Sequence, residues 1–284
     1  MRIGFLGLGE MGANIALRLL DCGYSIYATK RGNYECCENK KNFFLYDSPR
    51  EISELVECFI LCIDTVENLK EILYSKDGIL KSKNKPSFIF DLSTGLPSVV
   101  KKNYEDLKKV GVSYVDAPIG RTPEHALEGK LNLFVSCKKT ELDKSQIKIL
   151  EIISENRFYF DEISEGTKLK LLNNFFGQCI TLIFGKTLLA NNKNFQSINN
   201  LSKIMSAGPL HAPILDAIKP HFEKMNQGSM QFSIKNALKD LKYFREDLLS
   251  EKDELTEFVI NKFEKAVKDG FGNESVAEVA KYVD

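Results

Sequence analysis

The sequence has no excess of charge of either sign. It contains 39 Lys and Arg residues and 39 Asp and Glu residues among its 284 residues, so the formal net charge is zero. Proteins that hold nucleic acid or an anionic membrane surface through bulk charge carry a basic excess. The composition therefore argues against both kinds of partner.

Long apolar runs are also missing. No run reaches the roughly 18 apolar residues that a transmembrane helix needs. The first residues, MRIGFLGLG, enter a predicted strand without the basic segment and cleavage site of a signal peptide. We therefore expect a cytoplasmic protein, and its 43% hydrophobic content is enough for one or two domains.

Cysteine occurs seven times, an odd number, and no CxxC pair accompanies it. Four of the seven lie in apolar runs, as small core residues do in a reducing compartment. These four are Cys58, Cys62, Cys137 and Cys179. Cys36 and Cys37 are adjacent in a polar stretch that does not favour a metal site, so we predict no metal ligand and leave their role open.

Strands and helices are predicted to alternate through the first 160 residues. Cys58–Ile63, for example, is fully apolar, which is typical of a strand buried in a parallel sheet, whereas Met11–Asp21 has helical periodicity. This alternation predicts an α/β domain with a doubly wound parallel sheet. The other predicted strands are Arg2–Leu6, Ser25–Thr29, Phe88–Asp91, Val112–Val115, Leu131–Ser136 and Arg157–Phe160.

From about Ser164 onward, all the predicted elements are helical. Thr167–Asn191 forms one long helical pattern, and the later segments show no strand-like alternation. We therefore expect a C-terminal all-α domain joined to the first domain by a long helix. The predicted domains are residues 1–162 and 163–284.

A glycine-rich segment follows the first predicted strand and opens the first predicted helix. In this context a GxGxxG pattern is the dinucleotide fingerprint of a Rossmann domain, because glycines permit a tight turn and close approach of a pyrophosphate to the helix N-terminus. The alternative is an ordinary glycine-rich turn. The predicted cofactor contacts here are Gly7, Leu8, Gly9, Glu10, Met11 and Gly12.

The end of the second predicted strand indicates which dinucleotide is bound. An acid at this place contacts the ribose 2′-hydroxyl of NAD, whereas an arginine accommodates the 2′-phosphate of NADP. Thr29 is followed by Lys30 and Arg31, and no acid appears before Glu35. These cations favour NADP, although NAD stays possible and a solvated basic turn is the alternative.

Two further strand ends carry candidate contacts, since open α/β sheets bind ligands at the carboxyl ends of their strands. Cys62 and Ile63 close one strand, and we predict that they contact the cofactor. Ser93 and Thr94 follow another strand and offer hydroxyl and N–H groups, Ser93 to a substrate and Thr94 to the cofactor. A simple helix N-cap is the alternative for this pair.

Two polar residues share one face of the long predicted helix. Lys170 and Asn174 are four residues apart, and leucines and phenylalanines surround them. A lysine in a desolvated cleft has a lowered pKa and can exchange a proton near neutral pH. A surface lysine and a capping asparagine are the alternative.

The loop DAPIGRTPEHALEGKLNLFVS holds Gly120, Arg121 and Thr122 between two predicted strands. A guanidinium beside a hydroxyl and a bare backbone N–H suits a small oxyanion. We predict that these residues bind the acidic end of a substrate. The alternative is a structural ion pair between Arg121 and Glu124 or Glu128.

Together these segments resemble the β-hydroxyacid dehydrogenase family, over nearly the whole chain and in the same order. FLGLGEMG is similar to the family's cofactor motif, DLSTGLP to its DxSTxxP segment, GTKLKLLNN to its catalytic-lysine motif and KNALKDL to its C-terminal cofactor motif. The resemblance implies a Rossmann domain, an all-helical second domain and a homodimer or homotetramer. It also implies that Lys170 is the general acid/base, that Asn174 orients the substrate and that Lys239 holds the nicotinamide half of the cofactor.

The chain departs from the family in its substrate loop. Most members have Ser-Gly-Gly where this chain has Gly120-Arg121-Thr122, a form that resembles the sulfolactaldehyde reductase branch. The segment Gly208–Pro213 replaces the aromatic lid that the family often carries, and it leaves the role of His211 open.

These expectations combine into an NADP-preferring oxidoreductase that interconverts a short acid-bearing aldehyde and the matching hydroxy acid. An imine reductase or a decarboxylating hydroxyacid dehydrogenase of the same architecture is one alternative. A non-catalytic, cofactor-binding module is another. Retention of Lys170 favours carbonyl chemistry over imine chemistry and argues against the non-catalytic module.

Overall fold

The protein is described by a computed structural model that covers residues 1–195, 198–210, 212–223 and 230–283. It divides into two compact units, Met1–Lys170 and Leu171–Asp284. The division falls inside helix α7 (Glu165–Phe195), the long helix that the sequence predicts. A functional boundary near residue 162, just before α7 begins, stays a prediction.

The first unit is built on six parallel strands in the order β3-β2-β1-β4-β5-β6. The chain order reverses between β1 and β4, and at such a point the loops after neighbouring strands leave in opposite directions and open a crevice. The doubly wound fold is therefore confirmed. The strands are β1 (Arg2–Leu6), β2 (Ser25–Thr29), β3 (Phe43–Tyr46), β4 (Cys58–Leu61), β5 (Phe88–Asp91) and β6 (Ser113–Asp116).

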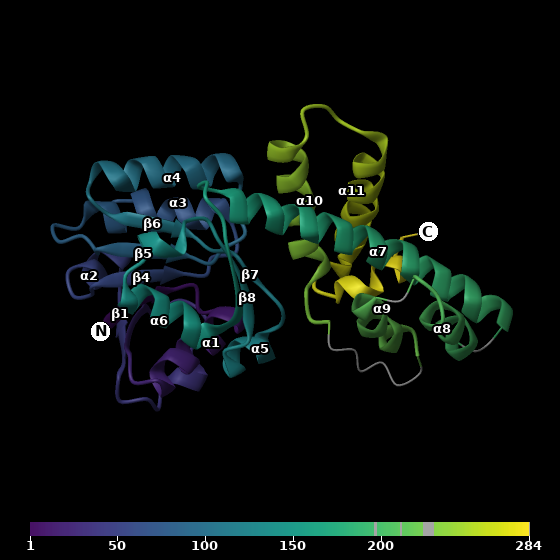
Figure 1. The fold of residues 1–284 in the computed structure, drawn as a ribbon, viewed down its shortest axis with the longest axis horizontal. Coiled ribbons are helices and arrows are strands. Elements are labelled where there is room, and N and C mark those ends of the chain that lie inside the picture. The colour runs from purple at the N-terminus through teal and green to yellow at the C-terminus, as the bar shows by residue number, and fades with distance from the viewer. Residues whose placement is uncertain (196–197, 211, 224–229, 284) are drawn as a thin grey trace. The chain divides into compact units, whose positions relative to one another are not determined.

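Helices cover both faces of this sheet (Figure 1). In β4, Cys58 and Ile60 enter the core cluster beneath α1 (Glu10–Asp21) and α6 (Lys144–Ile153), whereas Phe59 and Leu61 enter the cluster on the other face. Successive strand residues point to opposite faces, so a strand buried on both faces must be continuously apolar. The helices of the second face are α2 (Pro49–Ser53), α3 (Val66–Tyr74) and α4 (Pro97–Lys109).

Three strands that follow β6 form a separate sheet, β7-β8-β9. The sequence placed two of them, Leu131–Ser136 and Arg157–Phe160, in the main sheet, and that expectation was wrong. Pro118 lies two residues after the end of β6 and has no N–H to continue a ladder. The chain then enters β7, which pairs antiparallel with β8. The strands are β7 (Ile119–Gly120), β8 (Leu131–Val135) and β9 (Ser154–Tyr159).

The loop between β7 and β8 contains a short helix, α5 (Pro123–Glu128), that was not predicted. Proline occupies its first turn, and Gly129 ends it with a φ of 71°. Proline at the start and a left-handed glycine at the end are the ordinary limits of a helix. The substrate loop of the sequence is therefore partly helical.

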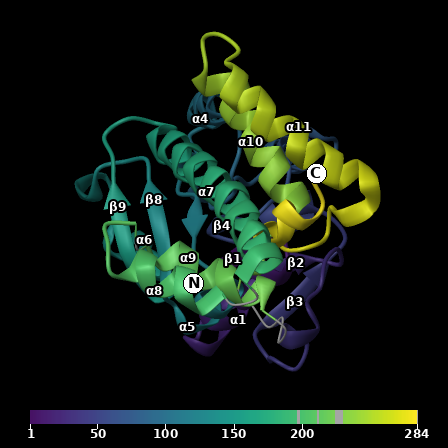
Figure 2. The same ribbon diagram turned by 90° about the vertical axis from the view of Figure 1, so that its right-hand side faces the viewer.

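The described elements of the second unit are helices, as the sequence predicts. Helices α10 (Ile234–Leu248) and α11 (Glu254–Ala266) lie side by side (Figure 2). Leu182 of α7 packs into their shared core, and Ser233 and Asp253 cap their N-termini. Two shorter helices are α8 (Ile198–Ser206) and α9 (Pro213–Ile218). Among the described residues, no helix has both the length and the apolar character needed to cross a bilayer.

Candidate functional site

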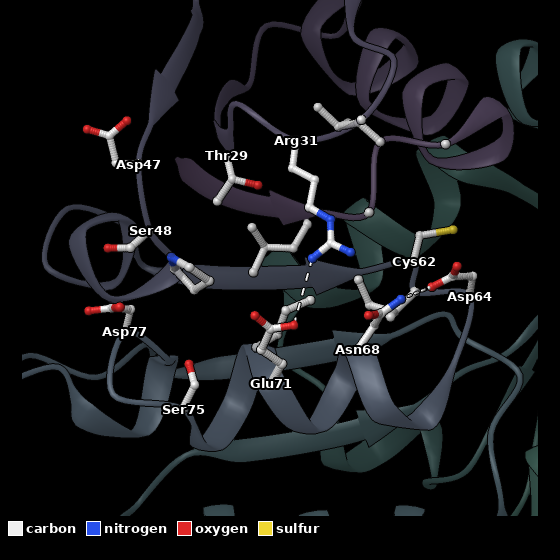
Figure 3. A pocket seen from close by; sticks show the side chains of 18 of the residues that line it. Thr29, Arg31, Asp47, Ser48, Cys62, Asp64, Asn68, Glu71, Ser75 and Asp77 are labelled. Carbon is white, nitrogen blue, oxygen red and sulfur yellow. Dashed lines mark hydrogen bonds and ion pairs between the residues drawn. The ribbon is translucent and has the colours of Figure 1, made fainter.

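The first unit has a cavity of about 600 Å³ at the carboxyl ends of β1, β2 and β4, beside α3 (Figure 3). This is the edge of the sheet at which the strand order reverses. The structure brings together seven of the predicted cofactor contacts here. They are Gly7, Leu8, Gly9, Thr29, Arg31, Cys62 and Ile63.

Two glycines of the fingerprint are required by the backbone itself. Gly7 has a φ of +96°, and a Cβ at this position would lie 2.1 Å from the carbonyl oxygen of Cys62. A Cβ on Gly12 would lie 1.9 Å from the carbonyl oxygen of Gly7. Both distances are far inside van der Waals contact. These glycines let the β1–α1 turn pack against β4.

Gly9 has a different environment, because a Cβ there would have no atom within 4 Å. It is the N-cap residue of α1, and no side chain caps this helix end. The first N–H groups of an uncapped helix and its dipole favour an anion. The open space at Gly9 therefore fits the diphosphate of a dinucleotide, and Glu10 and Met11 lie in the helix turn that would hold it.

Two basic residues after β2 each contact a carboxylate. Arg31 Nη1 lies 3.8 Å from Glu71 Oε2, and both side chains line the cavity (Figure 3). Lys30 Nζ lies 2.6 Å from Asp47 Oδ1, and this hydrogen bond raises the pKa of Lys30. Glu71 and Asp47 were not predicted as partners, because they follow the cations by 40 and 17 positions and only the fold brings them close.

Ser93 uses its hydroxyl to join two strand ends. Its Oγ accepts a hydrogen bond from the backbone N–H of Ile63 at 2.9 Å, and its own N–H donates to Asp91 Oδ1 at 3.0 Å. Burial raises the pKa of Asp91, which also accepts a hydrogen bond from Tyr114. Ser93 thus fixes the loop after β4, and Thr94 stands half-buried next to it, outside the cavity lining.

Arg121 lies in the turn between β7 and α5, with Gly120 before it and Thr122 after it. The φ of Arg121 is +79°. Its guanidinium donates a hydrogen bond to the carbonyl of Lys130 at 2.6 Å, and Arg121 Nη1 lies 2.5 Å from Glu155 Oε2 of β9. Glu155 is a partner that the sequence did not suggest. Thr122 Oγ1 lies 2.8 Å from His125 Nδ1. The role of these residues in binding an acid group stays a prediction.

Lys170 is the last residue of the first unit, and Asn174 lies one turn later in α7. Asn174 Nδ2 donates to Asp240 Oδ2 at 2.7 Å, and Lys239 Nζ lies 3.3 Å from the other oxygen of Asp240. Asp240 is only 3% exposed. It holds Asn174 and Lys239 together within the second unit, a role that the amphipathic pattern of α10 did not reveal.

The sequence left open the roles of the Cys36–Cys37 pair and of His211. Cys36 Sγ and Cys37 Sγ are 3.7 Å apart beside α1, and burial raises the pKa of Cys37 to about 12. His211 lies outside the described residues. Within the described ranges, no three His, Cys, Asp or Glu residues are grouped so that they could hold a metal ion.

Residues 2–161, more than half of the chain, match the family described as the NAD binding domain of 6-phosphogluconate dehydrogenase. The chain belongs to this family. Its first unit is therefore a nicotinamide-dinucleotide-binding domain, and the cavity lined by Gly9 and Arg31 stays the predicted place for the cofactor.

The chain is also similar to named enzymes. It is 31% identical over 173 residues to mitochondrial 3-hydroxyisobutyrate dehydrogenase of Mus musculus, a match that covers 61% of this chain and 51% of the mouse protein. It is 24% identical over 243 residues to glyoxylate/succinic semialdehyde reductase 1 of Arabidopsis thaliana, covering 85% and 83% of the two chains. The chain thus spans about half the length of the mouse relative.

The fold is shared with solved structures. A 3-hydroxyisobutyrate dehydrogenase from Salmonella typhimurium superimposes with a TM-score of 0.82 over 99% of both chains, at 18% identity. This structure shows that the fold is shared, and the two relatives confirm the resemblance to the β-hydroxyacid dehydrogenase family.

Proposed function

We propose that the protein is an NADP(H)-dependent oxidoreductase that interconverts a short acid-bearing aldehyde and the corresponding hydroxy acid. The observation that carries the proposal is the cavity. Gly9 leaves open space in it at the N-terminus of α1, and Arg31 also lines it. The names of the two relatives support carbonyl or hydroxyl chemistry on a small acid. We further propose that residues 163–284 provide the substrate side and that the protein is a homodimer or homotetramer.

The preference for NADP rests on the pair Arg31 and Glu71. Both side chains are largely exposed and 3.8 Å apart, and such ion pairs contribute little, about 0 to 1 kcal/mol. A 2′-phosphate carries up to two negative charges and can accept two hydrogen bonds from one guanidinium. It would therefore displace Glu71 readily, whereas the neutral 2′-hydroxyl of NAD would not.

The chain's own groups supply the proton and the orientation. A bound nicotinamide supplies or accepts the hydride. Lys170 donates a proton to the carbonyl oxygen during reduction and removes it during oxidation. Asn174, held by Asp240, orients the substrate near this oxygen, and Lys239 holds the cofactor beside them. Ser93, Gly120, Arg121 and Thr122 contact the substrate at its acid end, where Arg121 exchanges Glu155 for the substrate oxyanion.

The test is NADPH oxidation with a panel of short aldehydes. The panel contains succinate, methylmalonate and tartronate semialdehydes and sulfolactaldehyde, because carboxylate and sulfonate both suit a guanidinium. We expect turnover of at least one member, its loss in Lys170→Ala, and its retention in Lys168→Ala, a neighbouring lysine of the same helix turn. Turnover that survives in Lys170→Ala, or activity with cyclic imines alone, would contradict the proposal.

A further inference from the structure

A buried cluster of polar groups holds the first turn of α7. Asp116, the last residue of β6, is fully buried and accepts three hydrogen bonds. Thr167 donates two of them, from its hydroxyl at 2.6 Å and from its backbone N–H at 3.2 Å. Ser136, just after β8, donates the third at 2.7 Å, and its Oγ accepts from the N–H of Gly166 at 2.8 Å. Two consecutive N–H groups of α7 are therefore bound by side chains distant in sequence.

The helix has no local substitute for this cluster. Ser164 precedes α7 with a φ of +68°, which non-glycine residues rarely adopt. Its buried hydroxyl has no hydrogen-bond partner among the described residues, although serine before a helix usually caps it. The cap of α7 thus comes from Asp116 and Ser136. Gly166 permits this close packing, because a Cβ there would lie 2.1 Å from the carbonyl oxygen of Phe134.

The cluster fixes more than the position of the helix end. The N–H groups of Gly166 and Thr167 both point along the helix axis, but they lie about 100° apart around it at 3.6 residues per turn. The hydroxyl of Thr167 leaves the axis sideways. Bonds to all three groups therefore fix the rotation of the helix about its axis as well as its displacement along it. Lys170 follows Thr167 by three residues, about 4.5 Å along the axis at 1.5 Å per residue. Both residues belong to the first unit, so the cluster sets the direction in which the lysine side chain leaves α7.

We propose that Asp116, Ser136 and Thr167 are positioning residues for Lys170, which they aim by fixing the first turn of α7 in place and in rotation. The proposal rests on the proposed function of Lys170. A side chain that only stabilised the fold would not need a buried acid, because burying an acid costs stability that an apolar contact would not. A displacement of about 1 Å at a reacting group can lower a rate roughly 100-fold, so a fixed lysine direction matters for turnover.

The experiment compares Thr167→Val, which loses the hydroxyl donor, with Thr167→Ser, which keeps it. Ser154→Ala is the matched control, since it removes another buried serine hydroxyl bond, to the carbonyl of Leu150. We expect kcat to fall at least 10-fold in Thr167→Val with the KM for NADPH unchanged, and to stay within about 3-fold of wild type in Thr167→Ser and Ser154→Ala. A Thr167→Val protein that loses stability like Ser154→Ala but keeps wild-type kcat would overturn the proposal.

A second measurement does not depend on turnover. Reductive ¹³C-methylation labels the lysines, and the resonance missing from Lys170→Ala belongs to Lys170. We expect this resonance to shift in Thr167→Val and in Ser136→Ala, and to keep its place in Ser154→Ala. An unshifted resonance in both cluster variants would refute the positioning role. If Lys170→Ala retains turnover while the resonance shifts, the proposed function fails and the positioning of Lys170 stands.

Discussion

Asp116 should make the stability of the protein fall as the pH rises, the reverse of what a salt-bridged carboxylate does. Burial raises the pKa of Asp116 from 3.8 to about 7, although the bonds from Thr167 and Ser136 act in the opposite direction. The folded state therefore favours the protonated acid. The stability that this preference contributes is fully present below about pH 4, where the unfolded chain is also protonated, and is lost as the pH rises through about 7.

The size of the effect follows from the pKa. Each pKa unit corresponds to 1.36 kcal/mol, so the rise to about 7 corresponds to about 4 kcal/mol between pH 4 and pH 8. Asp116→Asn keeps the size of the side chain and removes its titration. The free energy of unfolding of wild type minus that of Asp116→Asn should therefore decrease by about this amount over the same range.

The neighbouring ionisable groups must be considered. Asp91 pairs with Asp116 across β5 and β6, its pKa is also raised by burial, and Tyr114 donates a hydrogen bond to it. Their titration is common to both proteins and largely cancels in the difference. The assay is urea unfolding followed by circular dichroism, since the sequence has no tryptophan. A difference that stays flat from pH 4.5 to pH 8 would refute the reasoning and mean that the three donors keep Asp116 ionised.

Three other predictions concern the cofactor cavity and the second unit. Arg31→Ala should raise the Kd for NADPH roughly 10- to 100-fold and leave the Kd for NADH nearly unchanged, because charge-assisted hydrogen bonds contribute about 1.5 to 3 kcal/mol. Both Kd values can be measured by fluorescence titration. Equal losses of affinity for the two cofactors would contradict binding of the 2′-phosphate by Arg31. Glu71→Gln should lower the Kd for NADPH about 2- to 5-fold, since it removes a weak ion pair that competes with the 2′-phosphate for Arg31. An unchanged Kd would show that Glu71 does not compete with the cofactor. Gln178→Met should raise the free energy of unfolding by about 1 kcal/mol, because both amide atoms of Gln178 are buried without a hydrogen-bond partner among the described residues. A loss of stability in urea unfolding would contradict this and point to a water or ligand bound to the amide.

The sequence predicts well where one local pattern determines one element. β1, β2 and β5 begin and end where the pattern places them, because apolar strands and amphipathic helices differ in period. It missed β3, where Phe43–Tyr46 follows a polar stretch and its side chains are only partly buried. It also missed α5, although proline at its first turn and Gly129 at its end carry the signal.

Contacts between distant segments could not be predicted from the sequence. The GxGxxG turn is a local feature that the sequence alone reveals, and Gly7, Leu8 and Gly9 of this turn line the cavity. Glu155 comes to Arg121 from another strand, Asp240 comes to Asn174 from another helix, and Asp116 caps α7 from 51 positions away. The spacing of apolar residues along the sequence does not indicate such pairs, because each pair depends on how two elements pack. The partner of a charged residue therefore had to come from the structure.

The contrast between tightly packed glycines in the β1–α1 turn and exposed cations after β2 bears on how cofactor preference can evolve. Gly7 and Gly12 leave no room for a Cβ, so these two positions of the turn are closed to substitution. The side chains of Lys30, Arg31 and Glu71 are largely exposed. The proposed preference for NADP thus depends on positions that can change at little cost in stability, whereas the two glycines of the turn cannot change.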